Sequence, residues 1–235
     1  MKSKFGILSK LNFLQNFVST IISKTNPAVI HNIEKYVTIQ KIVFLNSSER
    51  QEGDYLEFGV YTGSSFCHAI RCFKECETFN PKQNLTNFFG FDSFEGFGEL
   101  NEKDKHPFYI DQNFQTKYND VKKRVAKTIS NWSKAVLIKG FFNDTLSVAP
   151  KDYGIKKARI VFIDSDTYSS AKYAFDFIKE IVTPGTHIIL DDFYNYRGNP
   201  NKGIASAFNE FISNSKYSYR KILDYGVGGI AVVLH

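Results

Sequence analysis

The chain has 235 residues, of which 43% are hydrophobic and 23% are charged, and these values are ordinary for a globular domain. Residues 1–50 hold seven Lys or Arg and two Asp or Glu, so they carry +5 of the total net charge of +6. Because the rest of the chain is nearly neutral, we expect no binding of nucleic acid, which usually needs a basic face on the folded domain. No apolar run is long enough for a transmembrane helix or a secretion signal, so the expected location is cytoplasmic.

Residues 1–50 are expected to form an N-terminal helical extension to one domain over residues 51–235. Apolar side chains recur at helical spacing in its first part: Ile7, Leu11, Leu14, Val18 and Ile21. This amphipathic helix is expected to pack on its own protein or on a twin subunit, which would give a homo-oligomer. A peripheral membrane contact is the alternative.

A second helix is expected from Pro27, with Asn26 as its cap, to about residue 45. No residue before position 52 is predicted to be catalytic.

Two short apolar runs, residues 160–163 and 187–190, each end on aspartates, with a helix-length segment between them. Apolar runs without alternation are typical of strands buried on both faces of a parallel sheet. The segment therefore predicts a right-handed strand, helix, strand crossover. Ligands bind beyond the carboxyl ends of such strands, and four acids lie there: Asp164, Asp166, Asp191 and Asp192. Four carboxylates at one edge repel one another unless a positive group joins them.

Residues 54–73 are expected to form a strand, a glycine-containing turn and a helix. Gly59 and Gly63 allow a tight turn and the close approach of a ligand. Ser64 or Ser65 would cap the helix, whose first amides are free donors. The turn differs from the GxGxxG of dinucleotide sites, and its glycines could equally serve the turn alone.

The next predicted strand, within residues 87–97, ends on Asp92, which could accept from ribose hydroxyls or cap a surface turn. Residues 97–118 are polar, lack periodicity and include His106, as expected of a lid. The remaining predicted elements are a helix around 121–129, a strand in 135–142, a helix at 203–213 and strands at 219–223 and 229–234.

Three cysteines, Cys67, Cys72 and Cys76, fall on one predicted helix. Their spacing is not that of a zinc site and their number is odd, so we expect reduced thiols in or near the core.

Five motifs follow one another from residue 53 to the C-terminus: EFGVYTGSS, FGFDSFEGF, GFFNDTL, IDSDTYSSA and ILDDFYNYRG. In this order they resemble the macrocin O-methyltransferase family of S-adenosylmethionine enzymes. The resemblance implies an α/β, Rossmann-like class I methyltransferase fold, with a seven-stranded, mostly parallel sheet and helices on both faces. It also implies methyl transfer from S-adenosylmethionine to a hydroxyl group.

Residue by residue, the resemblance assigns the cofactor loop to Glu57, Gly59, Tyr61, Gly63 and Ser64. It assigns the ribose contact to Asp92 and Ser93, and the segment beside the adenine to Gly140 and Phe141.

For the divalent metal of this family, usually magnesium, the resemblance implies Asp164, Asp191 and Asp192. Hard oxygen ligands suit Mg²⁺, and a cation would relieve the crowding of the carboxylates. The structural alternative is that some of these acids cap helices or pair with Arg197 and Lys202.

Two departures from the family concern the acceptor. Residues 164–166 are DSD where DGD is more frequent, and an aromatic stretch occupies residues 193–198. Because aromatic faces stack on sugar rings, the acceptor is expected to be a saccharide or another small hydroxylated molecule.

His106, Asp166 and Asp164 are predicted to take part in catalysis, the first two as candidate bases. The rival functions are an NAD-dependent oxidoreductase, which would not need the later acids, and a non-catalytic adaptor for a cofactor or a membrane surface.

Overall fold

A seven-stranded sheet forms the centre of the computed structural model, which describes residues 12–80, 85–98, 100, 102–109, 114–129 and 134–235. The strand order is β3-β2-β1-β4-β5-β7-β6. The strands are β1 (Asp54–Phe58), β2 (Phe88–Asp92), β3 (Ala135–Lys139), β4 (Ala158–Ile163), β5 (His187–Leu190), β6 (Tyr219–Tyr225) and β7 (Gly229–Leu234). Strands β1 to β5 pair in parallel, and β7 is antiparallel to β5 and β6. The predicted fold class is confirmed.

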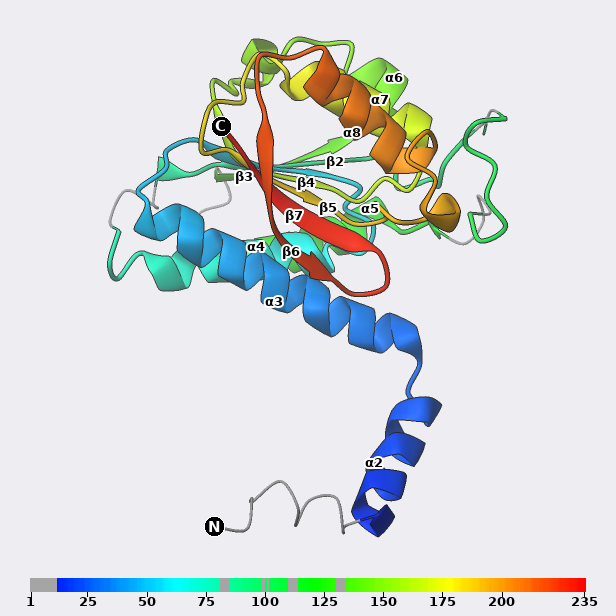
Figure 1. Ribbon diagram of the computed structural model, residues 1–235. Helices are drawn as coiled ribbons and strands as arrows, with labels where there is room; N and C mark the ends of the chain where they lie inside the picture. Colours follow the sequence, from blue (N-terminus) through cyan, green and yellow to red (C-terminus); the bar gives the residue numbers. More distant parts are fainter. Residues whose placement is uncertain (1–11, 81–84, 99, 101, 110–113, 130–133) are drawn as a thin grey trace.

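Helices cover both faces of this sheet (Figure 1). One layer contains α3 (Pro27–Ser48), α4 (Ser64–Cys76) and α5 (Tyr118–Thr128), and the other contains α6 (Phe142–Thr145), α7 (Tyr168–Ile178) and α8 (Gly203–Ser213). Two 3-10 turns, η4 (Pro150–Tyr153) and η5 (Tyr196–Gly198), lie in connections. The predicted crossover is β4, α7 and β5.

Strand β4 shows why the sequence lacks alternation. All six of its residues are buried, and successive side chains enter opposite apolar clusters. Val161 and Ile163 pack with residues of α7 and α8, whereas Ile160 and Phe162 pack with residues of α3 and α4. A strand that is covered on both faces has no polar side, so its apolar run is continuous.

Helix α3 is built into the layer beside α4. Asn26 caps it by accepting from the Ala28 amide at 2.9 Å, and Pro27 fills the first turn, as predicted. Its buried face contains apolar Ile39, Ile42 and Val43 but also Lys35, Thr38, Asn46 and Ser47. The predicted extension is therefore divided, because its second helix belongs to the packed body.

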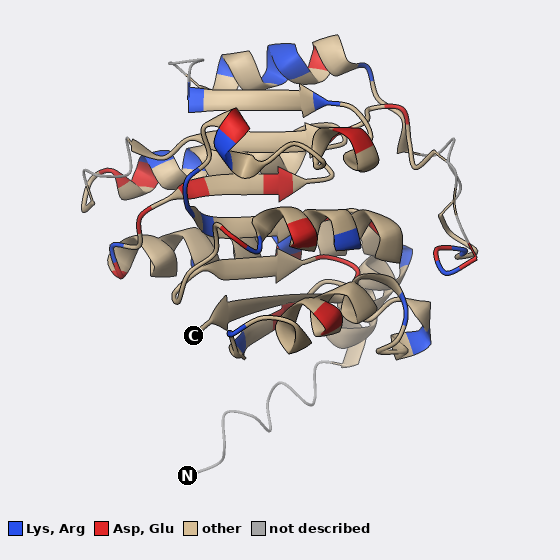
Figure 2. Ribbon diagram, turned by 90° about the horizontal axis from the view of Figure 1, so that it is seen from above, with Lys and Arg blue, Asp and Glu red and all other residues tan. Residues whose placement is uncertain are grey.

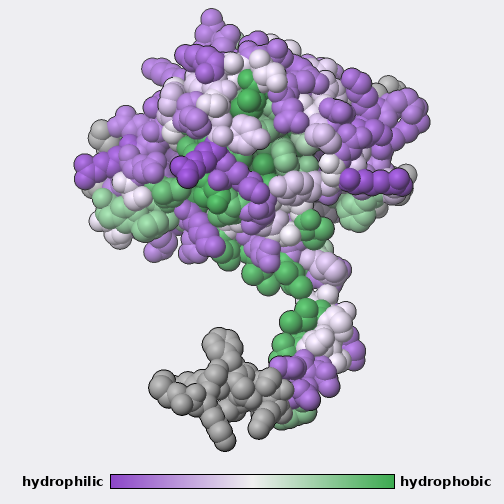
Figure 3. All heavy atoms as spheres, in the orientation of Figure 1, coloured by the Kyte–Doolittle hydropathy of each residue, from purple (hydrophilic) through white to green (hydrophobic). Residues whose placement is uncertain are grey.

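Helix α2 (Asn12–Lys24) buries none of its residues. It projects from the start of α3 (Figure 1), and Figure 3 shows hydrophobic side chains along it. Phe13 and Phe17 of this helix are exposed. The expected packing on the protein's own domain is not found for residues 12–24, while Ile7 and Leu11 lie outside the described residues. Packing on a twin subunit or a membrane surface stays a prediction. Among the described helices, none has the length and apolar character needed to cross a bilayer.

Removal of residues 1–24 tests the role of this arm. We expect cofactor affinity to be nearly unchanged, since the described residues that line the candidate cavity start at Asn26. Self-association or acceptor binding should weaken. Calorimetry and light scattering on the full and shortened chains measure both effects. Loss of cofactor binding in the shortened chain would place the arm in the cofactor pocket.

Candidate active site

A cavity of about 800 Å³ opens at the carboxyl edge of the sheet. Its walls come from the segments that follow β1, β2, β3, β4 and β5, from the start of α3, and from residues between 93 and 114. In the view from above in Figure 2, acidic segments lie in loops beyond the arrowheads of central strands. The edge predicted to bind a ligand is thus the edge that is hollowed.

The turn after β1 forms one wall, and Gly59 is required there. Gly59 has φ +93°, and a Cβ at this position would lie 1.8 Å from the carbonyl oxygen of Asp164. Tyr61 follows at φ 49°, in the left-handed region that costs a bulky residue energy. Gly63, at φ 76°, precedes the first residue of α4. Two central strands therefore approach more closely here than any side chain would permit.

Asp92 holds this turn in place. Its carboxylate accepts from the amides of Val60 at 2.8 Å, Tyr61 at 2.7 Å and Phe94 at 2.6 Å. Burial raises the pKa of Asp92, and these three amides oppose that rise. Asp92 lines the cavity as well, so both readings of this residue find support in its position.

The predicted cofactor residues divide into two groups. Those that line the cavity are Gly59, Tyr61, Asp92, Ser93 and Phe141, and those that do not are Glu57, Gly63, Ser64 and Gly140. Ser64 bonds to the hydroxyl of Tyr36 at 2.7 Å instead.

Glu57 lies fully buried at the end of β1. It accepts from the hydroxyls of Tyr55 at 2.5 Å and Ser65 at 2.6 Å, and burial raises its pKa to about 7. The bond from Ser65 ties β1 to the first turn of α4, so Glu57 supports the turn between them from inside.

Three carboxylates gather in the segments that follow β4 and β5. One oxygen each of Asp164, Asp166 and Asp192 lies within 4.8 Å of the other two. Oδ1 of Asp192 also accepts from Asn195 Nδ2 at 2.6 Å. Burial, and next the charge of a neighbouring carboxylate, raise the pKa of Asp164 and of Asp166 well above the usual range. Three carboxylate oxygens this close together could hold a divalent cation.

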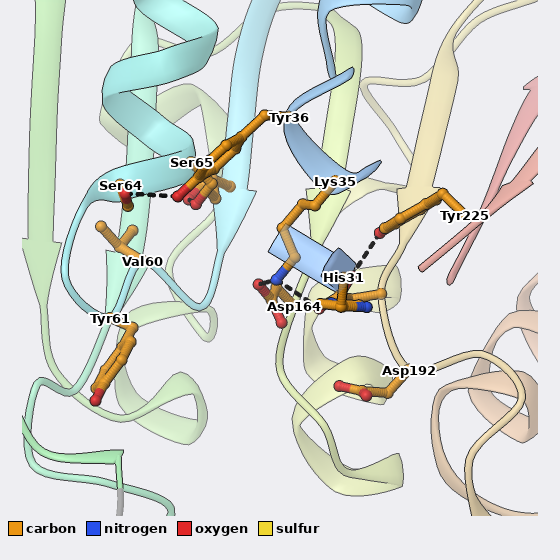
Figure 4. A network of polar contacts seen from close by, with 12 residues as sticks. His31, Lys35, Tyr36, Val60, Tyr61, Ser64, Ser65, Asp164, Asp192 and Tyr225 are labelled. Carbon is orange, nitrogen blue, oxygen red and sulfur yellow. Dashed lines mark hydrogen bonds and ion pairs between the residues drawn. The ribbon is translucent and has the colours of Figure 1, made fainter. Parts of the chain in front are cut away.

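Asp191, the third acid assigned by the resemblance, has other partners. It is 3% exposed, and its carboxylate meets Lys35 Nζ at 2.6 Å, His31 Nε2 at 3.2 Å and the hydroxyl of Tyr225 at 2.7 Å. Figure 4 shows the side chains of Lys35 and His31 beside Asp164, with Tyr225 pointing toward them. Burial favours the protonated acid, but Lys35 and His31 outweigh it and hold the pKa of Asp191 below its usual range.

His106 lines the cavity and is half-buried. Its Nδ1 accepts from the Phe108 amide at 3.2 Å, and its ring lies 4.4 Å from that of Tyr109 and 4.9 Å from that of Tyr196. Burial lowers the pKa of His106, although the charge of Asp192 opposes this. The structure thus brings His106 and Asp166 to one cavity.

The tyrosines expected to face a sugar do not line the cavity. The hydroxyl of Tyr194 donates to Asp224 at 3.1 Å, and that of Tyr196 donates to the carbonyl of Asp104 at 3.0 Å. Of this stretch, Asn195 reaches the cavity wall. Aromatic lining comes instead from other residues: Tyr61, Phe97, Phe108, Tyr109, Phe114, Phe141 and Phe142.

Sequence reasoning missed the contribution of α3, which brings His31 and Lys35 to the cavity. The acids were expected to pair with Arg197 and Lys202 if no metal joined them, yet the ion pairs of the described residues join them to Lys35 and His31. A signal was present. Lys35 lies four residues before Ile39 and so shares its buried helix face.

One buried polar atom on the cavity wall fits an absent ligand. The hydroxyl of Ser165 has no hydrogen-bond partner among the described residues, and Ser165 is 6% exposed. An unsatisfied buried hydroxyl costs free energy unless a bound group completes it.

The sequence family described as "Methyltransferase domain" matches residues 56–193, more than half of the chain. No curated protein sequence matches the chain. Among solved structures, the O-methyltransferase NovP aligns at a TM-score of 0.68 with 19% identity, over 84% of this chain and 78% of that one. CalS11, a calicheamicin methyltransferase, aligns at 0.68 and 19%, over 84% and 77%.

A third structure is TomG from Streptomyces achromogenes, an O-methyltransferase of tomaymycin synthesis in complex with S-adenosylmethionine, which aligns at 0.53 and 15%, over 84% and 78%. At these identities the structures show the shared fold, and the family match shows the class of enzyme. The macrocin type stays a prediction, but the chain belongs to the methyltransferase domain family.

Proposed function

We propose that this methyltransferase transfers the methyl group of S-adenosylmethionine to a hydroxyl oxygen of a small acceptor, with Mg²⁺ bound beside the acceptor. One observation carries the proposal: a single cavity is lined both by Gly59 and Tyr61 of the turn after β1 and by the carboxylates Asp164, Asp166 and Asp192. A nucleoside cofactor and a metal-bound acceptor would therefore meet within it. The NAD-dependent alternative explains the turn but gives no use to the carboxylates.

The first wall fits the cofactor, which when bound supplies an activated methyl group. Gly59, Tyr61 and Asp92 would hold the nucleoside, Ser93 would support the ribose side, and Phe141 would lie beside the adenine. Glu57, Gly63 and Ser64 would support the turn from behind, and Gly140 lies just after β3; none of these four residues lines the cavity. Ser165 offers a hydroxyl that lacks a partner among the described residues.

The second wall fits Mg²⁺, which when bound supplies positive charge that lowers the pKa of an adjacent hydroxyl. Asp164, Asp166 and Asp192 would hold the cation, because their oxygens lie near one another and their charges repel one another. Asp191, named for this role by the sequence resemblance, is held by Lys35 and His31.

A residue on the cavity wall would act as the general base that removes the proton from the acceptor hydroxyl. Asp166 lies two residues beyond the end of β4 at φ 61°, a left-handed conformation that Asp tolerates better than most residues. His106 lies nearby on the segment that was predicted to be a lid, and burial, which lowers its pKa, favours its neutral, proton-accepting form. Both residues line the same cavity and are the two candidates for the base.

The acceptor is proposed to be a small hydroxylated molecule, with a saccharide as the first choice. Aromatic side chains on the cavity wall, among them Tyr61, Phe97 and Phe114, offer faces for ring stacking. One CalS11 structure is described as a TDP-rhamnose 3'-O-methyltransferase, so the shared fold accommodates a sugar in that protein. The free thiols Cys67, Cys72 and Cys76 suit a reducing compartment, and a cytoplasmic location is part of this proposal.

Turnover with a panel of hydroxylated sugars and phenols tests the proposal. The protein is incubated with S-adenosylmethionine and Mg²⁺, and mass spectrometry follows methylated product and S-adenosylhomocysteine. We expect product from at least one hydroxylated acceptor and none from its deoxy analogue. Methyl transfer to amines or thiols alone would contradict O-methylation.

A further inference from the structure

We propose that Lys35 of α3 is a positioning residue for the metal site: it binds Asp191 and one oxygen of Asp164, and so keeps Asp191 out of the metal's ligand set. The inference rests on the proposed function, since it concerns the cation held by Asp164, Asp166 and Asp192. It gives α3, which was predicted to be part of an N-terminal extension, a role in the metal site.

Lys35 forms ion pairs with two of the four carboxylates. Its Nζ lies 2.6 Å from Asp191 Oδ2 and 2.9 Å from Asp164 Oδ2, and the residue is 8% exposed. An ammonium group this close to two carboxylates balances negative charge that would otherwise attract a divalent cation. Lys35 therefore divides the four acids into an internally neutralised part and a part that is open to a metal.

His31 lies one turn before Lys35 in α3. Its Nδ1 accepts from the Val227 amide at 3.1 Å, so the proton of the neutral ring lies on Nε2, which donates to Asp191 Oδ2 at 3.2 Å. Glu34 of the same turn accepts from the Gly226 amide. The β6–β7 connection thus fixes this end of α3 and orients His31 toward Asp191.

The remaining oxygen of Asp191 is also occupied, by the hydroxyl of Tyr225 at 2.7 Å. Both oxygens of Asp191 therefore have hydrogen-bond donors from the protein, whereas Asp192 accepts at Oδ1, from Asn195 Nδ2 at 2.6 Å. A carboxylate that is fully satisfied by fixed donors is a poor ligand, because binding a metal would break those bonds. Because Asp191 does not bind the cation, coordination positions on the cation stay open for oxygens of the acceptor.

Mn²⁺ titration of the full chain, followed by calorimetry and by the electron paramagnetic resonance of free Mn²⁺, tests the inference without turnover. Lys35→Met removes a positive charge near the site, so Mn²⁺ should bind about tenfold tighter or more, while turnover falls about tenfold as Asp164 and Asp191 become free to move. Lys35→Arg keeps the charge and should recover part of the turnover. Lys41→Met, at an exposed position of α3, is the matched control and should change neither value.

The double variant Lys35→Met/Asp191→Asn guards against misfolding, because it removes both members of the buried pair. We expect it to bind Mn²⁺ within about threefold of the unaltered protein, whereas Asp166→Asn should bind at least about tenfold more weakly. The opposite order, with binding lost in the double variant and kept in Asp166→Asn, would make Asp191 a ligand and overturn the inference. If the unaltered protein binds no Mn²⁺, the metal part of the proposed function fails and this inference fails with it, whereas the calorimetric test for S-adenosylhomocysteine stands apart.

Discussion

Asp192→Asn is expected to lower turnover by about a hundredfold or more, which corresponds to about 2.7 kcal/mol of transition-state stabilisation. The substitution keeps the shape of the side chain but removes one charge from the group formed with Asp164 and Asp166. Because Asp192 lies across the cavity from the Gly59 turn, affinity for S-adenosylhomocysteine should barely change. EDTA should abolish turnover of the unaltered protein, and Mg²⁺ should restore it. Initial rates with and without EDTA measure both effects.

Asp152→Asn is the matched control, since Asp152 is an exposed acid in η4 and away from the cavity lining. It should leave the rate and the metal dependence unchanged. If the unaltered protein keeps full activity in EDTA, the three carboxylates serve something other than a metal. Asp166 would then be the stronger candidate for the base, since it would act without a cation beside it.

Gly59→Ala is expected to lower the free energy of unfolding by about 4 kcal/mol or more, and the melting temperature by roughly 10 °C. The added Cβ would lie 1.8 Å from the carbonyl oxygen of Asp164, which is backbone and cannot rotate away. The φ of +93° adds strain for any residue with a side chain. The fraction that folds should also bind S-adenosylhomocysteine weakly, because relief of the clash displaces the turn. Thermal and urea unfolding measure the change.

Gly154→Ala separates the clash from the backbone strain. Gly154 has φ +80°, and a Cβ there would meet nothing within 4 Å. Its substitution should therefore cost only about 1–2 kcal/mol, the cost of a left-handed conformation. Equal losses for the two variants would show that the close approach of β1 to β4 is not what requires glycine at position 59.

The fold could be predicted because its signals are local. The apolar run of β4, the helical spacing in α7 and the acids after β4 and β5 each occur within a few residues of one another. Once a parallel sheet is inferred, topology alone brings Asp164 and Asp192 to one edge. The expected cavity lining by Gly59, Tyr61, Asp92, Ser93 and Phe141 follows for the same reason.

The partners of the acids could not be predicted, because they depend on how α3 lies across the sheet. Asp191 and Asp192 are adjacent in sequence, yet one faces Lys35 and Tyr225 while the other faces Asp166. Successive residues after a strand point in different directions, and the sequence does not say which direction meets a helix 150 or so residues away.

The aromatic loop illustrates the same limit for acceptor contacts. Tyr194 and Tyr196 were expected at the cavity, but their hydroxyls bind Asp224 and the Asp104 carbonyl, partners that are distant in sequence. The aromatic stretch was expected to supply faces for ring stacking, but the aromatic lining of the cavity comes from Phe97, Phe114 and their neighbours.

Calorimetric titration with S-adenosylhomocysteine and, separately, with NAD tests the central claim most directly. The turn from Gly59 to Ser64 and the carboxylate of Asp92 form a nucleoside site that lacks the GxGxxG cradle for a pyrophosphate. We therefore predict binding of S-adenosylhomocysteine with a dissociation constant on the order of micromolar and no measurable binding of NAD. Micromolar binding of NAD together with none of S-adenosylhomocysteine would contradict the assignment of this cavity to methyl transfer.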